Sequence, residues 1–302
     1  MRASASLLLC ATLAVALAGC GHPGGDRRSI PPVPTAAEIA RAERDRHTRA
    51  LRLASDRPDW GEAFAARGAV GTMLLFDTAT ERLQVHNAER AATRFTPAST
   101  SKVFNGLVFL DQGVLADPDS MLAWDGTERR LDVWNQDHSL RTGTRASAVW
   151  LFQRLANAVG RQGYADVFAR FPYGNATMGT PLDMAWLDGT LQISAQEQLA
   201  FIDGLHRETL PFAPEHQATI RDVLPVLLDG DGWTLRAKTG WGQCCGRPDI
   251  GWLVGWLERA RGDVVFVMNA EAAPGERFDI GEGRLGIVRD VLDGEGLLPD
   301  EG

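Results

Sequence analysis

Ser99 and Lys102 could do chemistry together, because they lie three positions apart in the segment Ser99-Thr100-Ser101-Lys102. In a helix that begins near Ser99, positions i and i+3 share a face, so the hydroxyl and the amine would point into one site. A serine at a helix start also lies near the positive end of the helix dipole and free backbone N–H groups, which favour a developing oxyanion. Taken alone, the pattern also fits an ordinary capped helix with a surface lysine.

Lysine is rare in this chain: of the 31 basic residues, only Lys102 and Lys238 are lysine, and every other one is arginine. Arginine stays protonated at ordinary pH and cannot act as a base, whereas a buried lysine can lose its proton. A free lysine has a pKa near 10.4, so burial must lower its pKa by about three units before the amine can serve as a base at neutral pH. The two lysines therefore indicate positions that require amine chemistry or a compact ammonium.

The second lysine lies in Lys238-Thr239-Gly240, beside Trp241 and at the end of a predicted strand. A lysine and a threonine at a strand edge, with a glycine beside them, offer a cation, a hydroxyl and an unobstructed backbone to a substrate carboxylate and carbonyl. The S-x-x-K and K-T-G elements are each weak signals, but together they indicate acyl transfer to a serine.

Hydrophobic periodicity predicts the elements that must position these groups. Pro97 just before Ser99 and Gly113 beyond Leu110 delimit a helix that carries the serine and the lysine. The other expected elements are a hairpin (70–77 and 83–86), helices (36–55, 146–160, 195–206, 214–229 and 284–293) and late strands (233–238, 250–257 and 264–269). Strands at both ends with helices between them predict an α+β fold, in which an antiparallel sheet is flanked by helices and a helical lobe is inserted.

The composition indicates one globular domain, with 302 residues of which 44% are hydrophobic and 23% charged. The net charge of −8 and the absence of a basic run argue against nucleic acid as a partner. The six histidines show no H-x-H or H-E-x-x-H spacing, so we expect no metal site.

The first 19 residues have the features of a secretory signal peptide, with Arg2 followed by a short apolar run. Leu17-Ala18-Gly19-Cys20 resembles a bacterial lipobox, which predicts a lipid on Cys20, a periplasmic location and, from Gly21, anchoring in the outer membrane. Ordinary cleavage after residues 16–18 is the alternative. We expect residues 20–55 to form the lipidated cysteine, a Pro- and Gly-rich tether and a solvated leading helix, and residues 56–302 to form the catalytic domain.

Two cysteines remain once Cys10 leaves with the signal peptide and Cys20 carries lipid. Cys244 and Cys245 are adjacent in sequence, so they are either free thiols in a loop or a rare vicinal disulfide. Free thiols are the simpler interpretation.

The chain resembles the serine β-lactamases and penicillin-binding proteins, and more closely the class D, or oxacillinase-type, β-lactamases. The resemblance runs in order from about Gly71 to Leu298. Beyond the two lysine motifs, the similar segments are Trp134-Asn135-Gln136-Asp137-His138, Ser147-Ala148-Val149, Tyr173-Gly174-Asn175, Trp186-Leu187-Asp188-Gly189 and Asp249-Ile250-Gly251-Trp252.

The resemblance implies hydrolysis of a β-lactam through an acylated Ser99, with Lys102 carboxylated by CO₂ as the general base. Ser147 would relay a proton to the leaving nitrogen, and the backbone N–H groups of Ser99 and Trp241 would form an oxyanion hole. The remaining implied positions are the lysine pocket (Val149, Trp186), the substrate-binding residues (Lys238, Thr239, Gly240, Trp241, Arg284) and the site-lining residues (Tyr173, Asn175). Arg277 competes with Arg284 as the carboxylate-binding arginine.

Two departures from the family pattern, Ser101 and Ala185, could wet the lysine pocket and slow deacylation. Two other functions stay open: a penicillin-binding transpeptidase or carboxypeptidase, and a β-lactam sensor that remains acylated. The resemblance implies a small β-lactam as partner, in a monomer or weak homodimer. Loop shape, which spacing does not supply, decides the preferred lactams.

Overall fold

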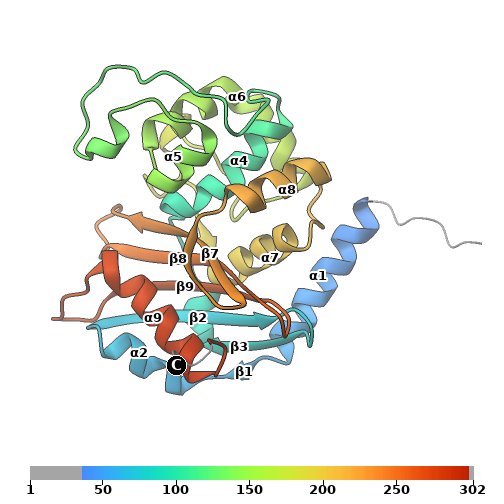
Figure 1. Cartoon of the computed structure of the whole chain (residues 1–302), viewed down its shortest axis with the longest axis vertical. Coiled ribbons are helices and arrows are strands. Elements are labelled where there is room, and N and C mark those ends of the chain that lie inside the picture. The colour runs from blue at the N-terminus through green and yellow to red at the C-terminus, as the bar shows by residue number, and fades with distance from the viewer. Residues whose placement is uncertain (1–35, 299–302) are drawn as a thin grey trace, which may run out of the picture. The chain divides into compact units, whose positions relative to one another are not determined.

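The computed structural model describes residues 36–298, and its centre is a seven-stranded sheet in the order β1-β3-β2-β9-β8-β7-β6 (Figure 1). All neighbouring strands run antiparallel except β1 and β3. The strands are β1 (Ser55–Asp56), β2 (Ala69–Asp77), β3 (Arg82–His86), β6 (Val226–Gly230), β7 (Trp233–Gly242), β8 (Ile250–Arg259) and β9 (Val264–Ala272). Because β2 pairs with β9 along its whole length, the early hairpin and the late strands form one sheet, as the sequence predicts.

Helices cover both faces of this sheet, which is why its central strands are apolar on both sides. In β8, every residue from Ile250 to Leu257 is buried. Helices α9 (Ile280–Gly294) and α2 (Gly61–Ala65) pack on one face, where Phe64, Met73 and Ile287 share a core. Helix α7 (Ala195–His206) lies on the other face.

A helical lobe follows the first hairpin and contributes most of the second core. It contains α4 (Ser101–Asp111), α5 (Leu140–Ala146), α6 (Val149–Arg170) and α8 (Pro214–Val223). Helix α4 is buried from Ser101 to Leu110, so it lies inside the lobe with contacts on all sides. Between β3 and the lobe, α3 (Ala88–Ala92) leads into β4 (Arg94–Phe95), which pairs with β5 (Ile193–Ser194).

Two helix predictions are wrong at their boundaries. The helix expected over 214–229 ends at Val223, because Pro225 drives Leu224 into the extended region, and Val226–Gly230 becomes the edge strand β6. The helix expected over 146–160 begins only at Val149 and continues to Arg170 past a kink at Gly160, because Ala146 ends α5 and a turn at Ser147 and Ala148 separates the two helices.

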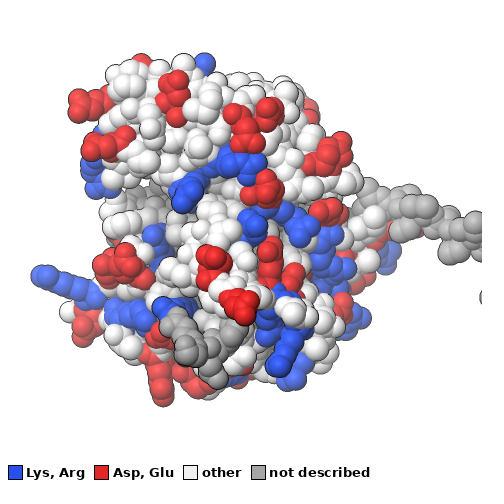
Figure 2. All heavy atoms as spheres, in the orientation of Figure 1, with Lys and Arg blue, Asp and Glu red and all other residues white. Residues whose placement is uncertain are grey.

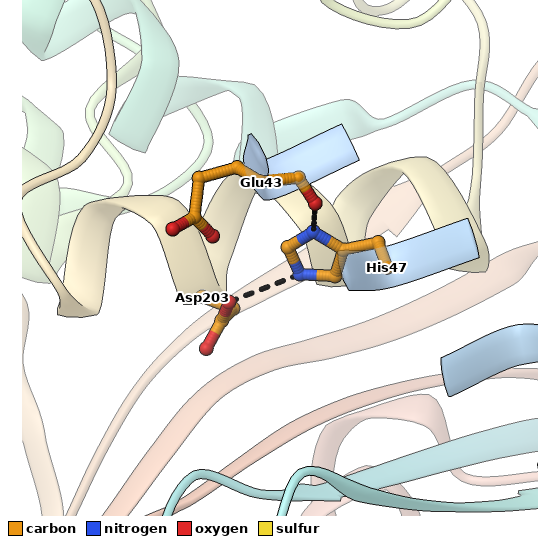
Figure 3. Close-up of side chains that lie close together, drawn as sticks. All are labelled: Glu43, His47 and Asp203. Carbon is orange, nitrogen blue, oxygen red and sulfur yellow. Dashed lines mark hydrogen bonds and ion pairs between the residues drawn. The ribbon is translucent and has the colours of Figure 1, made fainter. Parts of the chain in front are cut away.

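Helix α1 (Ala36–Arg52) is only partly solvated, contrary to the sequence prediction. Arg46, His47 and Ala50 are buried, and the guanidinium of Arg46 contacts the fully buried Asp203 of α7. The imidazole of His47 contacts the same carboxylate (Figure 3). These contacts attach the helix to the fold.

The predicted signal peptide (1–19), lipidated Cys20 and tether (21–35) lie outside the described residues. Within the described residues, no helix is both long and apolar enough to span a bilayer. On the face shown in Figure 2, acidic and basic side chains are interspersed, and this face has no continuous basic surface of the kind that binds nucleic acid.

Candidate active site

The serine segment is held between the sheet and the helical lobe. A short 3₁₀ turn (Ala98–Thr100) leads directly into α4, so Ser99 precedes the first turn of a buried helix, as predicted. The Thr100 hydroxyl donates to the Pro97 carbonyl at 2.7 Å and accepts from the Gln198 amide at 2.8 Å. These bonds fix the backbone on both sides of the half-buried Ser99 side chain.

The Lys102 amine contacts the Ser99 hydroxyl. Its Nζ lies 3.1 Å from Ser99 Oγ, and the side chain is 1% exposed. Burial lowers the pKa of Lys102 to about 7. The amine lies 5.0 Å from the ring centroid of Phe152 on α6. A neutral amine within hydrogen-bonding distance of a hydroxyl can act as its general base at neutral pH.

The two departures from the family pattern do not open this pocket. Ser101 is fully buried, and its hydroxyl donates to the Ala98 carbonyl at 2.7 Å, within its own helical turn. Ala185 is also fully buried. With Lys102 1% exposed, the expectation that these residues wet the lysine pocket is not supported by the packing.

Ser147 lies in a turn between two helices, and the sequence prediction of Ser147-Ala148-Val149 on a helix is wrong for its first two residues. Ser147 ends α5 with a φ of 55°, and the Ala148 N–H donates back to the Gly143 carbonyl. The Trp134 indole holds this turn by donating to the Ala146 carbonyl at 2.8 Å. The turn directs the Ser147 hydroxyl toward β7, where it accepts a hydrogen bond from Lys238 Nζ at 2.6 Å.

The Lys238-Thr239-Gly240 segment lies on β7, beside the serine turn. A Cβ atom on Gly240 would lie 3.0 Å from the Pro97 carbonyl oxygen, so glycine permits this close approach. Arg284 on α9 donates to the Gly240 carbonyl at 2.6 Å. Arg277 is exposed near the start of β2, so Arg284 is the arginine that the fold brings to this strand.

Three buried basic side chains, Lys102, Lys238 and Arg284, therefore lie on the elements that meet beside the serine turn. No ion pair between residues 36 and 298 involves Lys102, Lys238 or Arg284. The pKa of Lys238 is well below its ordinary value because the amine is buried, with a further contribution from the charges of Lys102 and Arg284. Burial also lowers the pKa of Arg284. Such a cluster is expected to attract an anion, for example the carboxylate of a ligand.

Trp186 carries a buried donor that has no acceptor among residues 36–298. The side chain is 0% exposed, and its indole nitrogen has no hydrogen-bond partner, which is unusual for a buried polar group. Its carbonyl accepts a hydrogen bond from the Thr96 hydroxyl at 3.0 Å. Val149 is the half-buried first residue of α6, three positions before Phe152.

The other predicted positions differ in what they contact. Thr239 is half-buried, with its hydroxyl 3.4 Å from Lys238 Nζ, and Trp241 is 48% exposed, with its indole donating to Asp249. Tyr173 is fully buried and stacks on Phe104, which makes it part of the lobe core.

Asn175 has a backbone-bracing role. Its side chain donates to the Thr190 carbonyl and accepts from the Gln192 N–H, so it joins two stretches of backbone. The hydrogen bonds of Tyr173 and Asn175 go to Gln198, Thr190 and Gln192 rather than to Ser99 or either lysine.

Two contributors to the site were missed from the sequence. Phe152, whose ring faces the Lys102 amine, lies three positions after Val149, so helical periodicity could have placed both on one face. Gln198, which fixes Thr100 from α7, has no distinguishing local pattern, and only the tertiary fold brings it there.

The one group of possible metal ligands in residues 36–298 lies elsewhere, at Glu43, His47 and Asp203 (Figure 3). Arg46 contacts both carboxylates, so a guanidinium already neutralises them. We interpret this group as the ion-pair joint that holds α1 on α7.

The adjacent cysteines form a vicinal disulfide, so the interpretation as free thiols is wrong. The pair lies in the loop between β7 and β8. This loop follows Trp241 directly, so the disulfide belongs to the surroundings of the site.

Comparisons with known proteins place this geometry in a family. The model of the penicillin binding protein transpeptidase domain matches residues 69–293, which include the serine turn, β7 and α9. This match defines a penicillin-recognising serine acyl-transfer domain.

Individual relatives show which group of these domains the chain is most similar to. Beta-lactamase OXA-20 of Pseudomonas aeruginosa is 38% identical over 80% of this chain and 88% of its own length. The solved class D β-lactamase FUS-1 (OXA-85) of Fusobacterium nucleatum subsp. polymorphum is 31% identical, with a TM-score of 0.76, over 81% of this chain and 100% of its own. The C-terminal domain of the Bacillus licheniformis BlaR penicillin receptor is 30% identical, with a TM-score of 0.75, over 82% of this chain and 98% of its own length. The chain belongs to the class D β-lactamases.

Burial of the Lys102 amine makes the free energy of unfolding depend on pH. Its pKa is about 7 in the folded chain and 10.5 when exposed, so between these values the unfolded chain binds more protons and stability rises with pH. Below about pH 7 the full penalty applies, on the order of 4 kcal/mol. We expect Lys102→Met to raise the free energy of unfolding at pH 7 by up to about 4 kcal/mol, with the gain disappearing near pH 10.5. Urea unfolding of the parent protein and of Lys102→Met between pH 7 and pH 10.5 measures this difference. Parallel pH profiles of the two free energies of unfolding would contradict the burial of the Lys102 amine.

Proposed function

We propose that the protein hydrolyses β-lactam antibiotics through an acyl-enzyme on Ser99 and thereby confers resistance to them. The observation that carries this proposal is the buried Lys102 amine, which lies 3.1 Å from the Ser99 hydroxyl and has its pKa lowered to about 7. Lys238 on β7 bonds to Ser147, and Arg284 bonds to the Gly240 carbonyl of the same strand. Penicillin-like substrates present a carboxylate next to a strained amide, which matches an anion-attracting strand beside a nucleophile.

In the proposed acylation step, Lys102 accepts the Ser99 proton while Oγ attacks the lactam carbonyl carbon. The backbone N–H groups of Ser99 and Trp241 stabilise the resulting oxyanion. Ser147, hydrogen-bonded to Lys238 at 2.6 Å, passes a proton to the leaving lactam nitrogen. Lys238, Thr239 and Arg284 bind the substrate carboxylate, and the neighbouring positive charges lose their mutual repulsion when it arrives.

A carboxylated Lys102 is part of this proposal. Reaction with CO₂ would convert the neutral amine into an anionic oxygen base that can also activate the water for deacylation. The amine is suited to the modification because burial holds its pKa near 7. The indole N–H of Trp186, which lacks a protein acceptor, would hold a carboxylate oxygen, and Val149 would shield it.

We also propose that the protein is exported to the periplasm and anchored through lipid at Cys20, as the lipobox-like segment suggests. The expected partners are β-lactams and the membrane, and the expected assembly is a monomer or weak homodimer. Mass spectrometry of the membrane fraction tests the anchor, since a Cys20→Ser variant should lose the lipid mass and appear in the soluble fraction.

The decisive experiment compares turnover with trapping, using purified residues 21–302. We expect many turnovers of a chromogenic cephalosporin per enzyme and no reaction with Ser99→Ala. A single burst that ends in a stable acyl-enzyme, detected as a mass increase, would instead identify a sensor like the BlaR domain or a penicillin-binding protein. Ser99→Ala removes one oxygen from a half-buried side chain, so unchanged thermal unfolding serves as the folding control.

A further inference from the structure

The disulfide between Cys244 and Cys245 touches the turn that follows Trp186. A Cβ atom on Gly189 would lie 2.3 Å from Cys245 Sγ and 3.1 Å from Cys244 Sγ, so the cysteines pack on the bare glycine backbone. Cys245 Sγ also lies 3.4 Å from the Asp188 carbonyl oxygen. Asp188 and Gly189 are two and three residues beyond Trp186, in the same turn.

This turn is joined to the buried site at its other end. The Trp186 carbonyl accepts from Thr96, and the Asp188 N–H donates to the Met184 carbonyl at 2.9 Å. A cavity of about 200 Å³ beneath the disulfide is lined by both cysteines, Thr96 and Gln192. Either sulfur can therefore move within this cavity. Such a movement would change the contacts of the turn that follows Trp186.

The pair is accessible to small reagents. Cys245 is exposed and Cys244 is half-buried. Cys245 has a φ of 67°, in the left-handed region that residues with a side chain rarely occupy. Opening of the ring formed by adjacent cysteines would release this backbone conformation.

We propose that Cys244 and Cys245 form a redox modification site whose disulfide clamps the β7–β8 loop onto the Asp188–Gly189 turn. A thiolate of a dithiol attacks one sulfur and forms a mixed disulfide, releasing the other cysteine as a thiolate. The second thiol of the reagent then attacks the reagent sulfur of the mixed disulfide and displaces the protein cysteine, so the reagent becomes a cyclic disulfide and the protein has gained two thiols. The reduced sulfurs separate, contact with Gly189 is lost, and the turn after Trp186 loosens.

The chemistry is easy to assign, because residues 21–302 contain only these two cysteines. In that protein, purified without reductant, we expect no free thiols by titration under denaturing conditions and two after dithiothreitol. Two free thiols before reduction under aerobic conditions would overturn the proposal.

Hydrogen exchange of residues 185–192 is the readout for the clamp. We expect dithiothreitol to increase deuterium uptake there at least threefold in rate, with little change in a peptide from β9. The double variant Cys244→Ser/Cys245→Ser should exchange at the faster rate of the dithiothreitol-treated protein, whether or not reductant is present. An unchanged exchange rate after complete reduction would refute the clamp.

The effect on catalysis rests on the proposed function and has a separate readout. With the turn loosened, we expect β-lactam turnover to fall about threefold or more in the reduced protein, and the double variant to show the lower rate and no response to dithiothreitol. Thiol count and exchange do not depend on turnover, so an inactive protein would refute the proposed function while leaving the redox site testable. Equal turnover in both redox states, with exchange changed, would refute the link to Trp186.

Discussion

Lys102→Arg is expected to abolish β-lactam turnover, lowering kcat/KM by about 10³-fold or more, because it removes the base while keeping a positive charge. The Lys102 amine lies 3.1 Å from the Ser99 hydroxyl and can be neutral, since burial lowers its pKa to about 7. A guanidinium stays protonated and cannot take the serine proton or react with CO₂ in this way. Steady-state and single-turnover kinetics, with added bicarbonate, measure the loss.

The other lysine provides a matched control. Lys238→Arg makes the same replacement at the site where a cation, not a base, is required. We expect it to retain far more activity, with the larger change in KM, because a guanidinium can still bind a carboxylate. Thermal unfolding of both variants separates loss of the base from loss of the fold. Activity of a folded Lys102→Arg protein near that of the parent would remove the role assigned to this amine.

Trp186→Phe is expected to lower turnover by about 10²-fold at ambient CO₂ and to make it strongly dependent on added bicarbonate. The indole N–H is a buried donor without an acceptor among residues 36–298, and phenylalanine keeps an aromatic ring while removing this donor. Loss of one hydrogen bond to an anionic group costs about 1.5–3 kcal/mol, enough to shift carboxylation toward the free amine. The carbamate signal in ¹³C NMR with labelled bicarbonate follows occupancy directly.

Trp256→Phe is the control for loss of a buried indole. Trp256 is also fully buried, but its N–H donates to Glu258 within the sheet. We expect it to lower stability without changing the bicarbonate concentration at half-maximal turnover. If both tryptophan variants respond to bicarbonate like the parent, Trp186 has only a packing role.

The sequence predicts the reacting groups well because their chemistry is uncommon in it. Lysine occurs only twice among the 31 basic residues, and each lysine lies in a motif, which singled out Lys102 and Lys238. The structure brings both side chains to one site. The sheet was predictable as well, since β2, β8 and β9 are apolar runs bounded by turn residues. For the carboxylate-binding arginine the sequence left two choices, and only the tertiary fold, which brings Arg284 on α9 to the Gly240 carbonyl of β7, decides between them.

The failures arise where tertiary contacts override local pattern. The turn at Ser147 depends on the Trp134 indole bonding to its backbone, a contact that no local periodicity encodes. The sequence of α1 predicts a solvated helix because its buried face carries the polar residues Arg46 and His47. Their burial depends on contacts with Asp203 on α7, which the local sequence does not show. Pro225, by contrast, was a visible signal for the end of α8.

The buried basic cluster of Lys102, Lys238 and Arg284 affects the steady-state amount of this protein in a cell. Burial of Lys102, Lys238 and Arg284 costs folding free energy, and an anionic drug that binds beside them would relieve that cost. A molecule that stays bound, as a poor substrate or inhibitor does, therefore protects the folded chain from proteases. Exposure to such a compound would increase the amount of enzyme without any change in gene expression.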